Sequence, residues 1–240
     1  MKPKKTNSSF LYLAVLLLLF SVGITLFVRS GFFAIREIQP SGLVNVQAEE
    51  ITQLSSGVIG ENLLLFDAAE LERKIKLHPL VKAVDFQRKL PHTLEIKITE
   101  RMPAALVAVT NGVIEVDEEG VFLRRVEDWP GSYPVITGAE IADTAGPGQA
   151  LPDKNLAVAL KLLGQAPKEM LPLIGEINVN SIQQVNLFLT SGIEVKLGHM
   201  ENWEGKLVTL MELLTDKDFQ AVEKSVRYID FTAAKPVIGK

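Results

Sequence analysis

The feature that most constrains this chain of 240 residues is an uninterrupted apolar segment close to its N-terminus, Phe10–Val28. Its 19 residues include neither a charged residue nor a proline. A helix of this length spans roughly 28 Å, which is close to the thickness of about 30 Å of a bilayer's hydrocarbon core. The sequence therefore predicts a transmembrane helix, assigned to residues 10–29, after a short tail of residues 1–9.

A cleaved signal peptide and a buried core helix are the two alternatives to this anchor. The apolar part of a signal peptide is about 7–15 residues long and is followed by a cleavage site of the A-x-A type. The segment here is longer and continues into Arg29-Ser30-Gly31-Phe32-Phe33, which lacks such a site. Only nine residues precede it, which disfavours a helix buried inside a globular domain. We therefore favour an uncleaved anchor.

The charges that flank the apolar segment predict its orientation. Lys2, Lys4 and Lys5 lie on the N-terminal side without any acidic residue, and Arg29 alone follows closely on the other side. Basic residues are enriched on the cytoplasmic side of membrane helices. We therefore expect a cytoplasmic N-terminus and an exported part that starts near residue 30.

The predicted exported part is acidic. From residue 30 onward it holds 21 Lys and Arg against 29 Asp and Glu, a net charge of −8. Proteins that bind nucleic acids present a basic face, so we expect no nucleic-acid partner. The same net charge disfavours an exported part that lies flat on an anionic bilayer. The chain has no cysteine, which excludes thiol catalysis, disulfides and cysteine-based metal sites.

The first exported block, residues 33–101, predicts a small domain with the element order β-α-α-β-β. Asn45 is expected to cap a helix that buries Ile51 and Leu54, and Asp67-Ala-Ala-Glu70 has the spacing of a capping box. His78-Pro79 is expected to end the second helix. Strands are expected at residues 35–38, 81–88 and 93–100.

The second block, residues 102–240, predicts a mostly antiparallel β domain with flanking helices, so the fold class is α+β. Asp153 is expected to cap one helix, and apolar residues at helical spacing predict another at Trp203–Leu214. Strands are expected at residues 105–109, 113–117, 121–124, 134–137, 174–179, 185–189, 193–197, 226–231 and 235–239.

Residues that could support catalysis are scattered along the chain. His78, His92 and His199 lie in separate segments without the spacing of a metal site, and no serine stands in a G-x-S-x-G motif. Asp117-Glu118-Glu119 is interpreted as a solvated hairpin turn rather than a catalytic carboxylate pair. We therefore expect no catalytic residue, cofactor, metal or small-molecule substrate, which favours a binding or scaffolding role.

Several motifs occur in a familiar order and spacing. They are Phe33-x-Ile35-x-x-Ile38, Gly60-Glu-Asn62-Leu63, His78-Pro79-Leu80-Val81, Arg88-x-Leu90-Pro91-x-Thr93-Leu94, Glu100-Arg101-x-Pro103-Ala104, Asp117-x-x-Gly120, Pro134-Val-Ile-x-Gly138, Gly192-x-x-Val195-x-Leu197-Gly198, Lys206-Leu207 and Ile229-Asp230-Phe231. The first block resembles a POTRA domain. Over nearly its whole length, the chain resembles the bacterial cell-division family FtsQ/DivIB.

This resemblance implies a bitopic protein of the inner membrane at the division septum, without catalytic activity. It implies a scaffold that links early and late components of the division machinery. The POTRA domain would help recruitment, and the β domain would bind the coiled-coil division proteins FtsB/DivIC and FtsL. The complex, together with other membrane proteins of the division machinery, would then help to control septal peptidoglycan synthesis.

The last predicted strand, Lys235–Gly239, is the candidate binding surface. At a sheet edge its unpaired N–H and C=O groups would accept a strand from a partner. Val237 and Ile238 would supply apolar contacts, and Pro236 would limit pairing on one side. Lys235 opens the strand.

Four further residues complete the candidate site. Tyr228 and Phe231 on the preceding strand either flank the contact or belong to the core. Arg88 and Arg101 have surface or capping roles as the simpler interpretation, with recruitment through the POTRA domain as the alternative. The edge strand of the POTRA domain is a second candidate surface.

Two other classes of function are possible. An envelope assembly or secretion module also contains POTRA domains, but it would need a long tail of alternating barrel strands. An exported cell-wall enzyme would need a pocket with converging titratable residues, and the sequence shows no motif for one.

Overall fold

The computed structural model describes residues 8–127, 131, 133–180, 182–199, 201–233 and 235–240. The chain divides into two compact units, Met1–Glu100 and Arg101–Lys240. The lysines that predict the orientation, Lys2, Lys4 and Lys5, lie outside the described residues.

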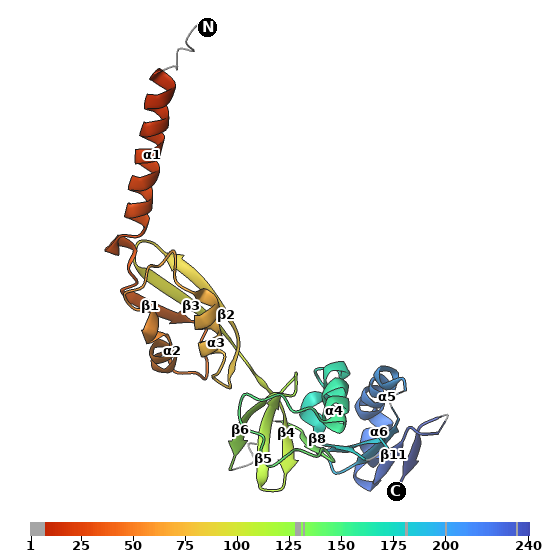
Figure 1. Ribbon diagram of the computed structural model, residues 1–240. Coiled ribbons are helices and arrows are strands. Elements are labelled where there is room, and N and C mark those ends of the chain that lie inside the picture. Colours follow the sequence, from red (N-terminus) through yellow and green to blue (C-terminus); the bar gives the residue numbers. More distant parts are fainter. Residues whose placement is uncertain (1–7, 128–130, 132, 181, 200, 234) are drawn as a thin grey trace. The chain divides into compact units, whose positions relative to one another are not determined.

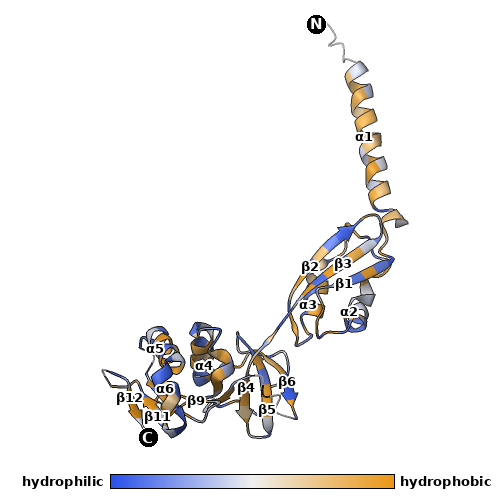
Figure 2. Ribbon diagram, turned by 180° about the vertical axis from the view of Figure 1, so that it is seen from behind, coloured by the Kyte–Doolittle hydropathy of each residue, from blue (hydrophilic) through white to orange (hydrophobic). Residues whose placement is uncertain are grey.

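The first element is the helix α1, Ser8–Val28. Its 21 residues span about 31 Å, and among the described residues it is the one helix long and apolar enough to cross a membrane. Figure 2 shows the predominantly apolar colouring of α1, and its large side chains, from Phe10 to Phe27, are exposed rather than packed on protein. The expected N-terminal apolar helix is confirmed.

The rest of the first unit has the predicted order β-α-α-β-β (Figure 1). The strand β3 lies in the middle of a sheet with the order β1-β3-β2, parallel to β1 and antiparallel to β2. The elements are η1 (Gly31–Phe33), β1 (Glu37–Ser41), α2 (Ala48–Ser55), η2 (Ser56–Val58), α3 (Ala68–Ile75), β2 (Val81–Lys89) and β3 (Thr93–Glu100).

The core of this unit forms where one face of the sheet meets both helices. Leu94, Ile96 and Ile98 alternate along β3 and are at most 2% exposed. They pack with a buried stripe from the helices that includes Ile51 and Ile75. Each such side chain contributes about 1.5–3 kcal/mol when it leaves water, so this stripe fixes the helices on the sheet.

Three expectations for the first unit need correction. The first strand begins at Glu37 rather than residue 35, because the Ile35 N–H donates to the Glu61 carbonyl in a loop. Asn45 does not cap α2, whose N-cap is Gln47, and Leu54 is 36% exposed while Ser55 is buried. The helix α3 ends at Ile75, before His78-Pro79.

The loop before α2 is fixed by the carboxylate of Glu100, the last residue of β3. Its oxygens accept hydrogen bonds from the backbone N–H groups of Val44 (2.7 Å), Asn45 (2.9 Å) and Val46 (2.9 Å). The Asn45 side-chain amide also donates to it at 3.2 Å, which is why Asn45 serves Glu100 instead of the helix. Burial opposes the charge of Glu100, but these hydrogen bonds outweigh it and lower its pKa.

In the second unit, nine strands of the described residues form one mixed sheet with the order β12-β11-β10-β9-β8-β7-β4-β5-β6. Five of its eight pairings are antiparallel, as in a mostly antiparallel sheet, while β7 is parallel to both neighbours and β10 is parallel to β11. The strands are β4 (Pro103–Val109), β5 (Gly112–Asp117), β6 (Phe122–Val126), β7 (Val135–Thr137), β8 (Ile174–Val179), β9 (Val185–Leu189), β10 (Glu194–Gly198), β11 (Tyr228–Asp230) and β12 (Val237–Gly239).

Helices cover this sheet. Figure 1 shows α4 (Lys154–Gln165) and α5 (Trp203–Thr215) on the same side of the sheet, and α6 (Lys217–Val222) follows α5. The short turns η3 (Leu171–Leu173) and η4 (Glu223–Ser225) precede β8 and β11. Asp153 caps α4 as predicted, since its carboxylate accepts the Leu156 N–H at 2.7 Å.

The final two strands are shorter than the sequence indicates. The predicted strand 226–231 is reduced to Tyr228–Asp230, and 235–239 is reduced to Val237–Gly239. Asp230 ends β11 because its carboxylate accepts the N–H (2.7 Å) and the hydroxyl (2.6 Å) of Thr232, which turns the chain.

Replacement of Glu100 tests the importance of its carboxylate. We expect Glu100→Gln to lower the free energy of unfolding of the first unit by about 2 kcal/mol, because charge-assisted bonds to three amides are lost. Because the pKa of Glu100 is lowered, its stabilisation is complete above the ordinary value of 4.5 and is lost as the pH falls below it. Amide hydrogen exchange at Val44–Val46, followed against pH, measures both effects.

The matched control is Glu95→Gln, on the same strand. Glu95 forms an ion pair with Lys89 at the surface (3.0 Å) and holds no loop amide, so exchange at residues 44–46 should stay at the wild-type rate. Equal protection in Glu100→Gln and the parent chain would show that the carboxylate does not hold the loop.

Candidate functional site

The two sheets have four edge strands, and β12 differs from the other three. Its sequence, Val237-Ile238-Gly239, has neither a charge nor a proline, and Val237 and Ile238 are 49% and 43% exposed. Within the described residues no strand pairs with its outer side. Such an edge is an open template for a further strand.

The register of β12 on β11 determines which groups face outward. The Gly239 carbonyl accepts the Arg227 N–H at 2.9 Å, so Gly239 faces β11. Because the backbone direction alternates along a strand, the N–H and C=O of Ile238 point to the open edge. The Ile238 side chain lies opposite Ile229, which is fully buried, so it extends the core face of the sheet past its edge.

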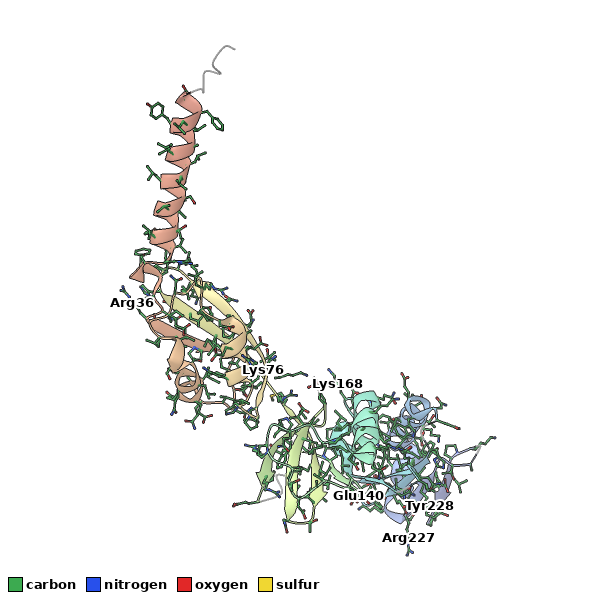
Figure 3. All side chains as sticks on the ribbon, in the orientation of Figure 1. Arg36, Lys76, Glu140, Lys168, Arg227 and Tyr228 are labelled. Carbon is green, nitrogen blue, oxygen red and sulfur yellow. The ribbon has the colours of Figure 1, made fainter. Side chains whose placement is uncertain are left out.

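Tyr228 supports β12 from the opposite face of the sheet. Tyr228 pairs with Gly239, and a Cβ added at Gly239 would overlap the tyrosine ring. The ring therefore covers the glycine, and the Lys196 ammonium lies 4.8 Å from the ring centroid. Figure 3 labels Tyr228 and the neighbouring Arg227 in this part of the sheet. The half-buried Tyr228 thus fixes the strand that presents the edge.

The remaining residues predicted for this site lie outside the strand. Lys235 and Pro236 are exposed and precede β12, and a proline could not donate a hydrogen bond to the ladder. Phe231 is 6% exposed and belongs to the core, which is the second of the two interpretations that the sequence left open. The structure therefore brings together Tyr228, Val237 and Ile238.

The opposite edge of the same sheet, β6, is protected. It carries Arg124 and Arg125, and Arg124 binds Glu115 on β5 through its Nε (2.7 Å) and Nη2 (3.1 Å). The start of β6 is also covered by a loop. The Phe122 N–H donates to the Gln149 carbonyl, and the Phe122 carbonyl accepts the Gly148 N–H. Charges and a covering loop both discourage strand addition.

The edges of the first sheet, β1 and β2, are protected in a similar way. β1 contains Pro40, and β2 alternates apolar residues with charged or polar ones. Arg88 near the end of β2 donates from Nε to the Leu63 carbonyl (2.9 Å), and its guanidinium lies 5.1 Å from the centre of the Phe66 ring. Arg88 thus helps to hold a loop while its side chain stays exposed.

Arg101 has a different environment from the surface or capping position expected of it. Its Nη1 group donates to Oδ2 of Asp117 and, at 2.7 Å, to Oε2 of Glu119. Asp117 is 2% exposed, so the prediction of a solvated turn is wrong for Asp117, while Glu118 and Glu119 are exposed as expected. Burial opposes the charge of Arg101, but the bonds to Glu119 and Asp117 outweigh it and raise its pKa.

Asp117 itself organises the turn between β5 and β6. Its second oxygen accepts the N–H groups of Glu119 (2.9 Å) and Val121 (2.8 Å). Arg101 thus neutralises a buried carboxylate that holds a hairpin. The sequence motif Asp117-x-x-Gly120 marks this turn, but nothing in it identifies Arg101 as the partner.

The comparison with known families agrees with this architecture. Residues 33–101 match the FtsQ-type POTRA domain, and residues 105–231 match the C-terminal domain of cell division protein FtsQ/DivIB. The chain belongs to the FtsQ/DivIB family. Membership gives it a role in cell division, and together with α1 it supports a bitopic protein of the inner membrane.

Similar FtsQ proteins come from several bacteria. The cell division protein FtsQ of Anaeromyxobacter sp. (strain K) is 32% identical over 207 residues, 84% of this chain and 69% of the relative. That of Geobacter sp. (strain M21) is 31% identical over 218 residues, 88% and 77% of the two chains. That of Streptomyces venezuelae is 27% identical, covering 89% and 82%.

A solved structure, the major extracytoplasmic domain of the cell division protein DivIB from Geobacillus stearothermophilus, is also similar. It aligns with 20% identity and a TM-score of 0.34, covering 46% of this chain and 87% of that chain. The FtsQ/DivIB match ends at Phe231, so the description of β12 comes from the present structure.

Replacement of Arg101 separates its structural role from recruitment. We expect Arg101→Gln to lower the free energy of unfolding of the second unit by about 3 kcal/mol, because Asp117 is left buried without a cation. Urea unfolding of the full chain in detergent micelles, followed by tryptophan fluorescence, measures the loss. Arg125→Gln, an exposed arginine on β6, is the control and should change stability by less than about 1 kcal/mol. Wild-type stability combined with lost recruitment in Arg101→Gln would instead make Arg101 a contact residue.

Proposed function

We propose that this protein is a non-catalytic scaffold of the bacterial division machinery. It binds FtsB/DivIC-like and FtsL-like coiled-coil proteins outside the cytoplasm and links early and late components of the machinery. Through this complex it helps to control septal peptidoglycan synthesis. Family membership supports the class of function, and the open edge at β12 supports the mode of binding.

The observation that carries the proposal is the contrast between β12 and the three protected edges. A partner strand beside β12 would pair with the outward N–H and C=O of Ile238. It would also cover the Ile238 side chain on one face and Val237 on the other, both of which are exposed in the isolated chain. Main-chain hydrogen bonds would provide affinity, and these two side chains would select apolar partner residues.

The anchor makes a small contact surface sufficient. A partner with its own membrane helix diffuses in the same bilayer, so the second contact forms at a raised effective concentration. The strand β12 has only three residues, and its pairing alone would be weak in solution. We therefore propose that the cytoplasmic N-terminus, α1 and the exported units form one tether that presents β12 to anchored partners at the septum.

Recruitment through the first unit is the second part of the proposal. Arg88 is exposed and lies at the end of an edge strand, which suits contact with another membrane protein of the division machinery. Arg101 is the weaker candidate, because its guanidinium is engaged with Asp117 and Glu119.

The location of the protein in dividing cells tests the proposed function. A fluorescent protein fused to the N-terminus should form a band at midcell during division. Time-lapse microscopy of growing cells measures this. Uniform envelope fluorescence throughout the cell cycle would rule out the scaffold role.

Charge placed on β12 tests the binding mode. Val237→Lys combined with Ile238→Lys should abolish co-purification of an FtsB-like partner from detergent-solubilised membranes. Loss of a buried apolar anchor costs about 2 kcal/mol per residue, roughly 30-fold in affinity for each. Affinity can be measured by titrating a labelled partner into the purified full chain.

The control is Val208→Lys, since Val208 is an apolar residue of α5 with 45% exposure, far in sequence from β12. It should bind like the parent chain. Undiminished binding by a folded Val237→Lys, Ile238→Lys chain would place the interface elsewhere on the protein.

A further inference from the structure

The end of the first unit that adjoins α1 is built around the last carbonyl of that helix. Carbonyls of a final helical turn lack partners within the helix. The Val28 carbonyl accepts the Asn62 side-chain amide at 2.6 Å, and the Phe33 carbonyl accepts the Leu63 N–H at 2.8 Å. The loop that follows Asn62 is thereby held at the point where the chain leaves the apolar helix.

The hairpin turn between β2 and β3 lies at the same end. The Arg36 N–H donates to the His92 carbonyl at 2.9 Å, and Arg88 Nε donates to the Leu63 carbonyl. Figure 1 shows the outer end of the hairpin beside η1, and Figure 3 places Arg36 there. Three segments, 28–36, 61–65 and 88–92, thus meet, and we call them the anchor-proximal face.

Large apolar side chains on this face are exposed. Phe32, Leu65 and Leu90 are 53%, 58% and 62% exposed, although they come from three separate segments. The Phe32 ring lies 5.5 Å from that of Phe27 in the last turn of α1, which joins the face to the apolar surface of the helix. Exposed apolar groups continuous with a membrane helix fit the interface of a bilayer.

The charge of the anchor-proximal face is opposite to that of the exported part as a whole. The three segments contain Arg29, Arg36, Arg88 and Lys89 against Glu61; with the two adjoining acids, Glu37 bonded to Thr93 and Glu95 paired with Lys89, the local net charge is +1. The exported part carries −8, so its acidic residues are concentrated elsewhere. The three arginines are exposed.

We propose that the anchor-proximal face is a lipid-binding surface. Phe32, Leu65 and Leu90 enter the interfacial layer of the bilayer, and Arg29, Arg36 and Arg88 bind the phosphate groups of anionic lipids. The bilayer is the occupant because the face is hydrogen-bonded to the end of the helix that crosses it. The acidic net charge disfavours an exported part that lies flat, but it does not oppose contact through this one basic end.

The electrostatic part of this contact has a measurable size. Near an anionic bilayer, each arginine changes the partition of the face between the membrane surface and water about fivefold. The effect falls off within a Debye length. Removal of one arginine should therefore shift the face toward water without releasing α1. Lysine in its place would retain the charge.

The absence of cysteine from the sequence permits a direct test on the full chain. Leu65→Cys and Leu90→Cys are labelled with an environment-sensitive fluorophore and reconstituted in vesicles whose lipids carry a nitroxide quencher at the headgroup. The vesicles contain phosphatidylcholine alone or mixed with phosphatidylglycerol. The reference is Val44→Cys, which is 76% exposed but sits at the far end of β3, where Glu100 binds its N–H. The eight residues of β3 place it about 25 Å away along the strand.

In vesicles with phosphatidylglycerol, we expect the labels at positions 65 and 90 to be quenched and to have a blue-shifted emission. The label at position 44 should have the emission of a fluorophore in water. Arg36→Gln should lower the ratio of quenched to unquenched label about fivefold, and Arg36→Lys should keep this ratio at the parent value. Labels at 65 and 90 that are as water-exposed as the label at 44 would overturn the proposal. Quenching that is the same in both kinds of vesicle and unchanged by Arg36→Gln would overturn the role of anionic lipids.

Discussion

The hydrogen bonds between Glu100 and the loop at Val44–Val46 are the interaction on which the first unit depends. They join the end of the central strand β3 to the start of α2, two points that are 54 to 56 residues apart in the chain. Without them, the loop amides would lose their acceptor at the edge of the core. The helix α2 would then be fixed mainly by Ile51 and by its contacts with β1 and α3.

The next residue, Arg101, has the equivalent role in the second unit. Its guanidinium neutralises Asp117, which holds the β5–β6 turn. Two neighbouring residues of opposite charge thus each satisfy groups of their own unit. This gives a physical reason for the motif Glu100-Arg101-x-Pro103, whose proline opens β4. An exchange of the two charges would leave a buried carboxylate and a set of loop amides unpaired at once.

The sequence predicts the regular elements well because their signals are local. The alternation in β3 and the cap at Asp153 follow from residues close together in the chain, and both are confirmed. The prediction that Asn45 caps α2 is wrong because its partner, Glu100, lies 55 residues away. The edge position of β12 could be expected from Pro236, because a proline limits pairing on one side of a strand. The role of Gly239 under the Tyr228 ring could not, because it depends on a cross-strand register that only tertiary pairing defines.

The unequal edges of the second sheet have a consequence for stoichiometry. A sheet with two open edges can grow by adding identical copies head to tail, which produces fibres rather than complexes of fixed size. Here the opposite edge, β6, carries arginines and is covered at Phe122 by the segment Gly148-Gln149, so a partner strand at β12, as proposed above, would meet no second open edge among the described residues of this sheet. The proposed addition would therefore stop at one partner strand per chain.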